Sequence, residues 1–334
     1  MIEINFTKNP QFWQSFLFHS LHAMLPPRSA NSIQDTHLVK IIGHRGLRHD
    51  KQTDDNSLVA FEAAFKDSDG IETDVSISAD GTPFLIHDIG RLNIRKIYSR
   101  TINMLKYCLD RASEKKLKGR RIDQIPDAEI DTLRLKKGSK IPRLSELFNL
   151  AAKYPGKHID LELKGSDTLQ PVLKEIDRAV KKGQITRDQI TLTSFDHHAI
   201  AEAAQHAPDI RRGVIFSGKG KSNTPIYPWS KNGKKRYYIS FNDKAISGKT
   251  MKSAAPDVAV MHASAINIKK IKSLKSQFPS IKIAIWESSK KPPSKNKTLK
   301  KVLSHPKIAP HIDAVITDHP AELKKLSKNL NKKP

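Results

Sequence analysis

The sequence predicts a closed (β/α)₈ barrel, the TIM-barrel fold, and three observations support this prediction. Short apolar segments alternate with amphipathic helical segments, a pattern typical of parallel strands joined by helical crossovers. About eight such strand-helix units can be counted when one predicted hairpin is left out. The glycine-rich dinucleotide loop that often accompanies an open, doubly wound sheet is missing after the first strand. The open sheet stays the alternative fold.

The barrel strands are predicted where β-branched and other apolar residues form short runs. These runs cover residues 37–43, 70–78, 158–164, 190–195, 211–216, 256–261, 281–286 and 312–318. Helices are predicted where apolar residues recur three or four positions apart after a polar capping residue or a proline. Three of them cover residues 53–65, 142–152 and 196–205. A fourth contains Leu173, Ile176 and Val180 and ends near Gly183, and a fifth contains Ile271, Leu274 and Phe278. The last helix begins at Pro320.

Three departures from simple alternation are expected. The letters ADGT (79–82) carry the Asp-Gly signal of a tight hairpin turn, so residues 83–88 form a small returning strand. The basic stretch 91–140 is expected to form helices that cap one barrel end. The stretch 217–250 is rich in Lys, Gly, Ser and Asn and predicts an elaborated loop with one short strand around RYYISF.

The barrel domain is expected to span residues 38–326, between an N-terminal extension (1–37) and a basic tail (327–334) that frays. Residues 11–25 predict an amphipathic helix rather than a cleaved signal peptide, because no basic flank or small-residue cleavage site accompanies them. The one cysteine, Cys108, excludes a disulfide within the chain and a cysteine-based zinc site. A cytoplasmic location is expected, with delivery elsewhere without a cleaved signal as the alternative.

The net charge of +25 arises from 59 Lys and Arg against 34 Asp and Glu. Such an excess favours anionic partners, namely phosphate-bearing small molecules or an acidic membrane surface, or is simply a solvated lysine surface. Nucleic acid is not expected as a partner, because aromatic residues make up only 6% and no stacking motif is present.

Ionisable residues gather at the ends of the predicted strands, where a barrel of parallel strands places its catalytic groups. They are His44, Arg45, Glu72, Asp74, Glu162, Lys164 and Asp318. Glu72 and Asp74 stand two positions apart, so both side chains point to the same face of their strand. Converging carboxylates repel one another, and either a hard divalent cation such as Mg²⁺ or Ca²⁺ or a salt-bridge network with Arg45 and Lys164 would resolve this repulsion.

Two histidines favour the metal interpretation. His44 ends the first strand, and His87 ends the hairpin that the strand of Glu72 and Asp74 begins. A pair of histidines beside a cation suits phosphoryl chemistry, since one can take a proton from the attacking oxygen and the other can protonate the leaving oxygen. Arg, Lys and a metal would stabilise the charge that develops on the other oxygens.

These segments resemble the glycerophosphodiester phosphodiesterase family. The resemblance rests on residues 43–88 together with IDLELK, TLTSF, IAIWE and DAVITDHP in the same order. It implies a TIM barrel that uses Mg²⁺ or Ca²⁺ to hydrolyse glycerophosphodiesters, or related lysophospholipids, to an alcohol and glycerol 3-phosphate. It further implies site roles: His44 and His87 as the acid-base pair, Glu72, Asp74 and Glu162 as metal ligands, Arg45 and Lys164 on the phosphate, and Trp286 near the substrate.

The sequence also departs from the family pattern. Asp54-Asp55-Asn56-Ser57 stands where the family usually has Pro-Glu-Asn-Thr, and IAIWESS lacks the usual Thr-Val-Asn after Trp286. Two other functions stay open. One is a sphingomyelinase D-like phospholipase on the same barrel, although such chains typically carry disulfides. The other is a non-catalytic barrel that binds anionic membranes.

Overall fold

The computed structural model describes residues 39–48, 50–87, 91–93, 101–103, 108–117, 120–165, 167–218, 225–227, 236–287 and 291–330. The helix expected over residues 11–25 lies outside the described residues. No helix in the described part of the chain has the length and apolarity needed to cross a bilayer.

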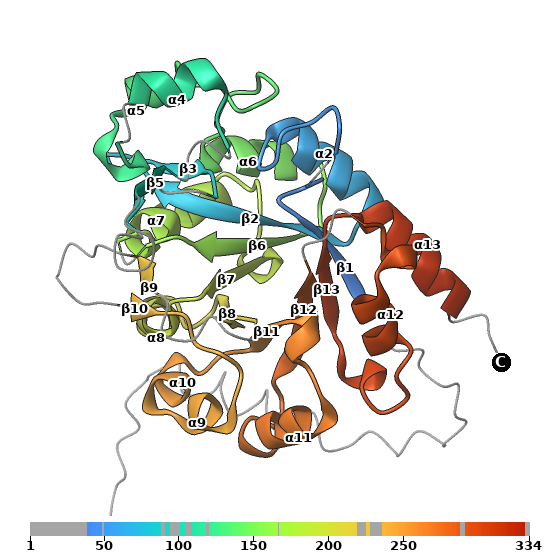
Figure 1. The fold of residues 1–334 in the computed structure, drawn as a ribbon. Coiled ribbons are helices and arrows are strands. Elements are labelled where there is room, and N and C mark those ends of the chain that lie inside the picture. The colour runs from blue at the N-terminus through green and yellow to red at the C-terminus, as the bar shows by residue number, and fades with distance from the viewer. Residues whose placement is uncertain are drawn as a thin grey trace, which may run out of the picture. The chain divides into compact units, whose positions relative to one another are not determined.

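Eight parallel strands close into a barrel, as the alternation of strand and helix predicts (Figure 1). They are β1 (Lys40–His44), β2 (Gly70–Ile77), β6 (His158–Leu163), β7 (Ile190–Ser194), β8 (Arg211–Phe216), β11 (Val258–His262), β12 (Lys282–Glu287) and β13 (Ala314–Thr317). The order runs β1-β13-β12-β11-β8-β7-β6-β2, and pairing of β1 with β2 joins the ends. The closed barrel is confirmed, and the open doubly wound sheet is excluded.

A helix follows each barrel strand before the next begins. These helices are α2 (Leu58–Asp67), α6 (Leu144–Ala151), α7 (Leu169–Lys181), α8 (His197–His206), α10 (Lys249–Ala254), α11 (Ile268–Gln277), α12 (Lys297–Leu303) and α13 (Pro320–Leu330). Short 3-10 turns lie at Ile122–Gln124, Arg187–Gln189, Ala263–Ala265, Pro293–Lys295 and Ala309–His311. Because α13 continues through Leu330, the first residues of the expected tail are helical.

The apolar residues divide into an outer layer and an inner one. Side chains between the strands and the helices form two large buried clusters, to which α2, α6 and α7 contribute on one side and α10 to α12 on the other. Inside the barrel, a smaller cluster joins Ile42, Ile215, Val260, Ala284 and Ile316. The interior next to β2 and β6 instead holds carboxylates, so the barrel core is apolar on one side and acidic on the other.

The hairpin predicted from ADGT is present. Gly81 has a φ of +83°, which glycine adopts without a steric penalty, and Ser78 N–H donates to Thr82 O at 3.0 Å. The returning strand β3 (Pro83–Leu85) pairs antiparallel with β2. The chain therefore turns back along β2 before it reaches His87.

The two basic insertions contain more regular structure than the sequence predicts. Residues 91–140 hold the helices α4 (Arg111–Leu117) and α5 (Asp127–Ile130), but also a two-stranded sheet of β4 (Arg91–Asn93) and β5 (Thr101–Asn103). An apolar cluster ties this region to β3 through Phe84 and Ile86. The predicted helices are therefore present, whereas the two strands were not predicted, because strands of three residues are too short to show an alternating pattern.

The short strand predicted around RYYISF is present, but the region 217–250 also contains a second strand and a short helix that the sequence did not predict. Two short strands, β9 (Pro225–Tyr227) and β10 (Arg236–Tyr237), pair with each other, and α9 (Asp243–Ser247) precedes α10. The Asn242 side chain caps α9 by accepting from Ala245 N–H. Ile246 and Met251 bury the apolar side of these helices, a sparse pattern that the many Lys and Ser residues conceal.

Candidate active site

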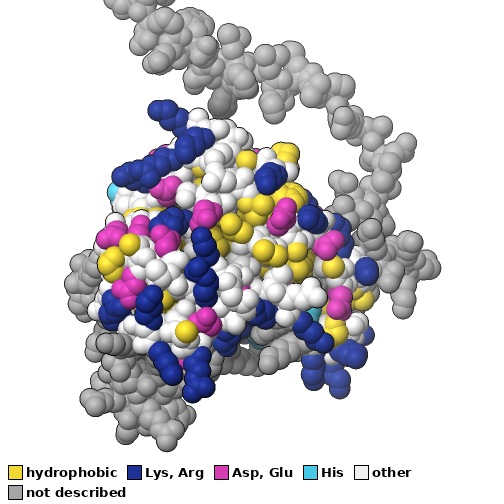
Figure 2. Space-filling view, turned by 90° about the horizontal axis from the view of Figure 1, so that it is seen from above, with side chains coloured by type: hydrophobic (Ala, Val, Ile, Leu, Met, Phe, Trp, Pro, Cys, Tyr) yellow, Lys and Arg dark blue, Asp and Glu magenta, His cyan; other side chains and the backbone are white. Residues whose placement is uncertain are grey.

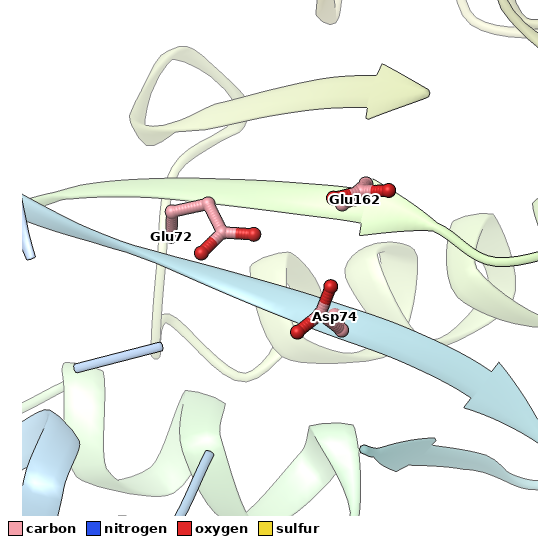
Figure 3. Close-up of side chains that lie close together, drawn as sticks. All are labelled: Glu72, Asp74 and Glu162. Atoms are coloured by element: carbon pink, nitrogen blue, oxygen red, sulfur yellow. The ribbon is translucent and has the colours of Figure 1, made fainter. Parts of the chain in front are cut away.

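Three buried carboxylates converge inside the barrel at the carboxyl ends of neighbouring strands. The register pairs Asp74 of β2 with Glu162 of β6, and Glu72 lies two residues before Asp74. One oxygen from each of Glu72, Asp74 and Glu162 lies within 4.8 Å of the other two. Figure 3 shows the three side chains gathered over β2 and β6.

Strand alternation explains why these acids face inward. Ile71 and Val75 of β2, and Leu161 and Leu163 of β6, pack in the layer between strands and helices. The side chains that alternate with these, namely Glu72 and Asp74 in β2 and Glu162 in β6, therefore face the barrel interior. The sequence spacing of Glu72 and Asp74 predicts this shared direction, but closeness to Glu162 required the pairing of β2 with β6.

Two cations contact the acidic cluster directly. The Lys164 Nζ lies 2.9 Å from Asp74 Oδ1 and also contacts Glu162, and the Arg45 Nε lies 3.1 Å from Asp74 Oδ2. Burial alone would raise the pKa of Asp74, but Lys164 and then Arg45 lower it well below its usual value. Asp74 is therefore ionised at neutral pH, and part of the salt-bridge network considered from the sequence is present.

The two glutamates are less well compensated. Burial raises the pKa of Glu72 well above its usual value, and Asp74 and Glu162 raise it further. Burial also raises the pKa of Glu162, against the opposing effect of Lys164. With all three carboxyl groups ionised, the cluster would carry more negative charge than Arg45 and Lys164 neutralise, and a further positive charge would stabilise that state.

The donor set fits a hard divalent cation. All three side chains offer carboxylate oxygens, the ligands that Mg²⁺ and Ca²⁺ prefer. Oxygens that share one such ion at about 2.0–2.6 Å lie no more than about 5 Å apart, and the three oxygens here satisfy this limit. The assignment of Glu72, Asp74 and Glu162 as metal ligands stays a prediction that this geometry supports.

His44 lies against the Glu72 side of the cluster. Its Nε2 is 3.8 Å from Glu72 Oε2, and its Nδ1 forms a 2.5 Å hydrogen bond with Asp318 Oδ1. Asp318 follows β13, which pairs with β1 and so places the carboxylate beside His44. Burial lowers the pKa of His44 although the hydrogen bond with Asp318 raises it. A neutral imidazole with Nδ1–H directed to Asp318 leaves Nε2 free to take a proton.

His87 returns to the Asp74 side. Ile86 N–H donates to Asp74 O at 3.1 Å, which fixes the chain one residue before His87 against β2. The half-buried His87 imidazole is close enough to help lower the pKa of Asp74. The hairpin thus brings the second histidine to the cluster, and the roles of both histidines stay predictions.

Trp286 lies at the end of β12, farther round the barrel. Its ring packs edge-on against Phe195, with centroids 6.3 Å apart, and against His262 at 4.7 Å. Phe195 connects it to the site, because Lys164 Nζ lies 5.9 Å from the Phe195 ring centroid. The Trp286 Nε1 is buried and has no hydrogen-bond partner among the described residues. A substrate contact for Trp286 stays a prediction.

Reasoning from the sequence assigned no role to three residues that shape this site. Asn56 donates through Nδ2 to Asp74 Oδ2 at 3.0 Å, Asp318 forms a hydrogen bond with His44, and Phe195 lies near both Lys164 and Trp286. Asp318 ends a predicted strand, so its position already indicated that it lies at the face of the barrel where the site forms. Asn56 and Phe195 stand in segments that carry the family resemblance, but the sequence does not show which side chains they contact.

Taken together, the barrel and its site define a class: a TIM-barrel protein with a buried cluster of three carboxylates beside two basic side chains and two histidines. The chain belongs to the glycerophosphoryl diester phosphodiesterase family, whose model matches residues 44–322. This membership makes it a phosphoric diester hydrolase and confirms the family resemblance.

Individual relatives agree with this membership. A glycerophosphodiester phosphodiesterase of Caldanaerobacter subterraneus subsp. tengcongensis is 28% identical over 180 residues, which is 53% of this chain and 66% of the relative. A crystal structure from Galdieria sulphuraria superposes with a TM-score of 0.64 at 18% identity, covering 87% of this chain and 98% of the other. An Oleispira antarctica phosphodiesterase in complex with the product sn-glycerol-3-phosphate gives 0.59 at 19% identity, with coverages of 88% and 98%. Because these sequence identities are below 20%, the structural matches show that this chain shares the fold of those proteins and no more.

Proposed function

We propose that this protein hydrolyses glycerophosphodiesters to an alcohol and glycerol 3-phosphate, with His44 and His87 as the proton-transfer pair. The observation that carries the proposal is the position of two histidines beside one buried acidic cluster, His44 against Glu72 and His87 near Asp74. Family membership supports the same reaction, and so does the product found in the Oleispira antarctica structure.

The chain's own residues divide the chemical work. One histidine removes the proton from the attacking oxygen as it bonds to phosphorus, and the other protonates the alcohol oxygen as the old phosphorus-oxygen bond breaks. Asp318 would stabilise the imidazolium that forms when His44 carries a second proton. Arg45 and Lys164 would bind phosphate oxygens from the positions where they contact Asp74. A divalent cation held by Glu72, Asp74 and Glu162 would supply electrostatic stabilisation of the transition state.

The direct test measures release of glycerol 3-phosphate from glycerophosphocholine in Mg²⁺ or Ca²⁺. His44→Ala and His87→Ala should each reduce kcat by about 10² to 10⁴, the usual contribution of a proton-transfer group. His206→Ala, which changes an exposed histidine on α8, is the matched control. Unchanged rates in both site variants would refute the assigned roles. Hydrolysis of sphingomyelin but not of glycerophosphocholine would favour the phospholipase alternative.

A second proposal concerns the surface. Residues 244–312 contain only two acidic residues, Asp257 and Glu287, and the helices α10, α11 and α12 in this stretch carry lysines and no acids. On the face shown in Figure 2, by contrast, acidic and basic side chains are interspersed. The lysine-rich stretch supports binding to anionic membranes. Cosedimentation with phosphatidylglycerol vesicles, but not with phosphatidylcholine vesicles, should be lost at high salt if this is correct.

A further inference from the structure

The loop between β1 and α2 approaches the acidic cluster in an unfavourable backbone conformation. Arg45 and Asn56 have φ angles of +52° and +59°, a left-handed region that residues other than glycine seldom adopt. Asn56 N–H donates to Arg45 O at 3.1 Å, which ties the two ends of the loop together. A loop with two such residues needs contacts that hold it in place.

Asn56 transmits the loop's position to Asp74. Its Nδ2 donates to Asp74 Oδ2 at 3.0 Å, and its Oδ1 accepts from Thr73 Oγ1 at 2.9 Å. Asn56 is 2% exposed, so water does not compete for these bonds. Asn56 therefore helps to orient the Asp74 carboxylate, together with Arg45 and Lys164.

A turn from the first insertion holds this loop from outside. The Asp54 carboxylate, 4% exposed, accepts from the backbone N–H groups of Lys137 at 2.8 Å and Ser139 at 3.1 Å. In return, Lys137 Nζ donates to Thr53 O at 2.6 Å and also to Asp50 O.

The turn itself is well anchored. Gly138, with a φ of +94°, allows both N–H groups to face one carboxylate. Leu135 and Ile141 on either side of the turn lie in the same apolar cluster as Phe84 and Ile86 of the hairpin arm. One small core therefore supports both the turn and the arm that carries His87.

We propose that Asp54 and the turn 137–139 are positioning elements for Asp74, and that they act through Asn56 to set the affinity of the site for its divalent cation. Asp54 touches none of the three predicted metal ligands in the contacts described above. It stands where the family usually has proline, which has no carboxylate, so this brace is specific to chains with an acidic residue here. The inference rests on the proposed metal-dependent function.

The test is calorimetric titration of Mg²⁺ and of Ca²⁺ into the full-length, metal-depleted protein without substrate. Asp54→Asn keeps the size of the side chain but weakens its bonds to the turn. We expect its metal dissociation constant to rise about tenfold, the lower end for a residue that supports a ligand indirectly. Asp50→Asn alters a carboxylate in the same loop that, in the part of the chain the structure describes, accepts from Gln52 and Thr53 and not from the turn. It should stay within twofold of wild type.

A double-mutant cycle separates positioning from general loosening of the loop. Asn56→Ala should weaken metal binding at least as much as Asp54→Asn, and adding Asp54→Asn to it should cause little further loss. Equal metal affinity in Asp54→Asn and wild type, or fully additive losses in the double variant, would overturn the proposal. Wild-type protein that binds neither metal would overturn it together with the predicted metal site. Metal binding with the expected pattern but no diesterase activity would support the brace and refute the proposed function alone.

Discussion

Replacing Asp318 by asparagine tests how the barrel prepares His44 for proton transfer. The Asp318 carboxylate can only accept a hydrogen bond, so its 2.5 Å contact holds the proton of a neutral His44 on Nδ1. An asparagine amide at this position can instead donate to Nδ1, which would place the proton on Nε2. The nitrogen that faces Glu72 at 3.8 Å would then have no lone pair for a proton.

The expected loss follows from this geometry. Both side chains are buried, with exposed fractions of 8% and 3%, so water does not replace the lost charge. Removing the charge-assisted hydrogen bond costs about 1.5–3 kcal/mol. The wrong tautomer adds to this loss, and a total of about 10² to 10⁴ in kcat corresponds to about 2.7–5.4 kcal/mol. KM should change much less than kcat.

Steady-state release of glycerol 3-phosphate is the assay, and Asp313→Asn is the control. Asp313 lies at the other end of β13, where its carboxylate accepts from Ile283 N–H at 2.8 Å and pairs with Lys282. The control should lower the melting temperature but keep kcat. A kcat for Asp318→Asn within threefold of wild type, in a folded protein, would refute this account of His44.

Three further predictions address the cation, pH and the backbone. Treatment with EDTA should reduce diester hydrolysis to background and added Mg²⁺ should restore it; full activity after exhaustive chelation would contradict the metal site. Burial lowers the pKa of His197 to about 4, so its contribution to stability is complete above pH 6.5 and is lost as pH falls toward 4. Between pH 7 and pH 5 His197 should contribute a loss of about 2 kcal/mol, so the loss measured by urea unfolding should be smaller by about that amount in His197→Asn, whereas His206→Asn should retain it. Gly46→Ala should lower the free energy of unfolding by clearly more than the roughly 1 kcal/mol expected for Gly156→Ala. Both glycines have positive φ, but an added Cβ at Gly46 would lie 2.6 Å from Ala60 C, whereas an added Cβ at Gly156 would have no atom within 4 Å. Equal melting temperatures for the two variants would contradict this prediction.

Local patterns in the sequence were sufficient to predict the barrel. Alternating apolar strands and amphipathic helices depend on neighbours a few residues apart, and all eight predicted barrel strands are present. The omissions lie in the insertions, where strands such as β4 and β9 are too short to form a pattern. Their formation depends on pairing with another segment rather than on their own residues.

The candidate site was predictable in part for the same reason. Residues at strand ends, such as Glu72 and Glu162, could be listed because parallel strands present their carboxyl ends to one face. The residues that hydrogen-bond to these side chains and orient them could not be predicted from the sequence. Asn56 donates to Asp74 from a left-handed backbone conformation, and apolar periodicity carries no information about that conformation.

The sequence by itself determined the order of strands and helices, the inward direction of Glu72 and Asp74, and the likeness to a family of phosphodiesterases. Only the tertiary structure decided that Asp318 bonds to His44 across 274 positions and that Asp54 accepts from the turn 137–139. The physical reason is that periodicity reports which face of an element is buried, whereas the partner of a buried polar group is chosen by closure of the barrel and packing of the insertion.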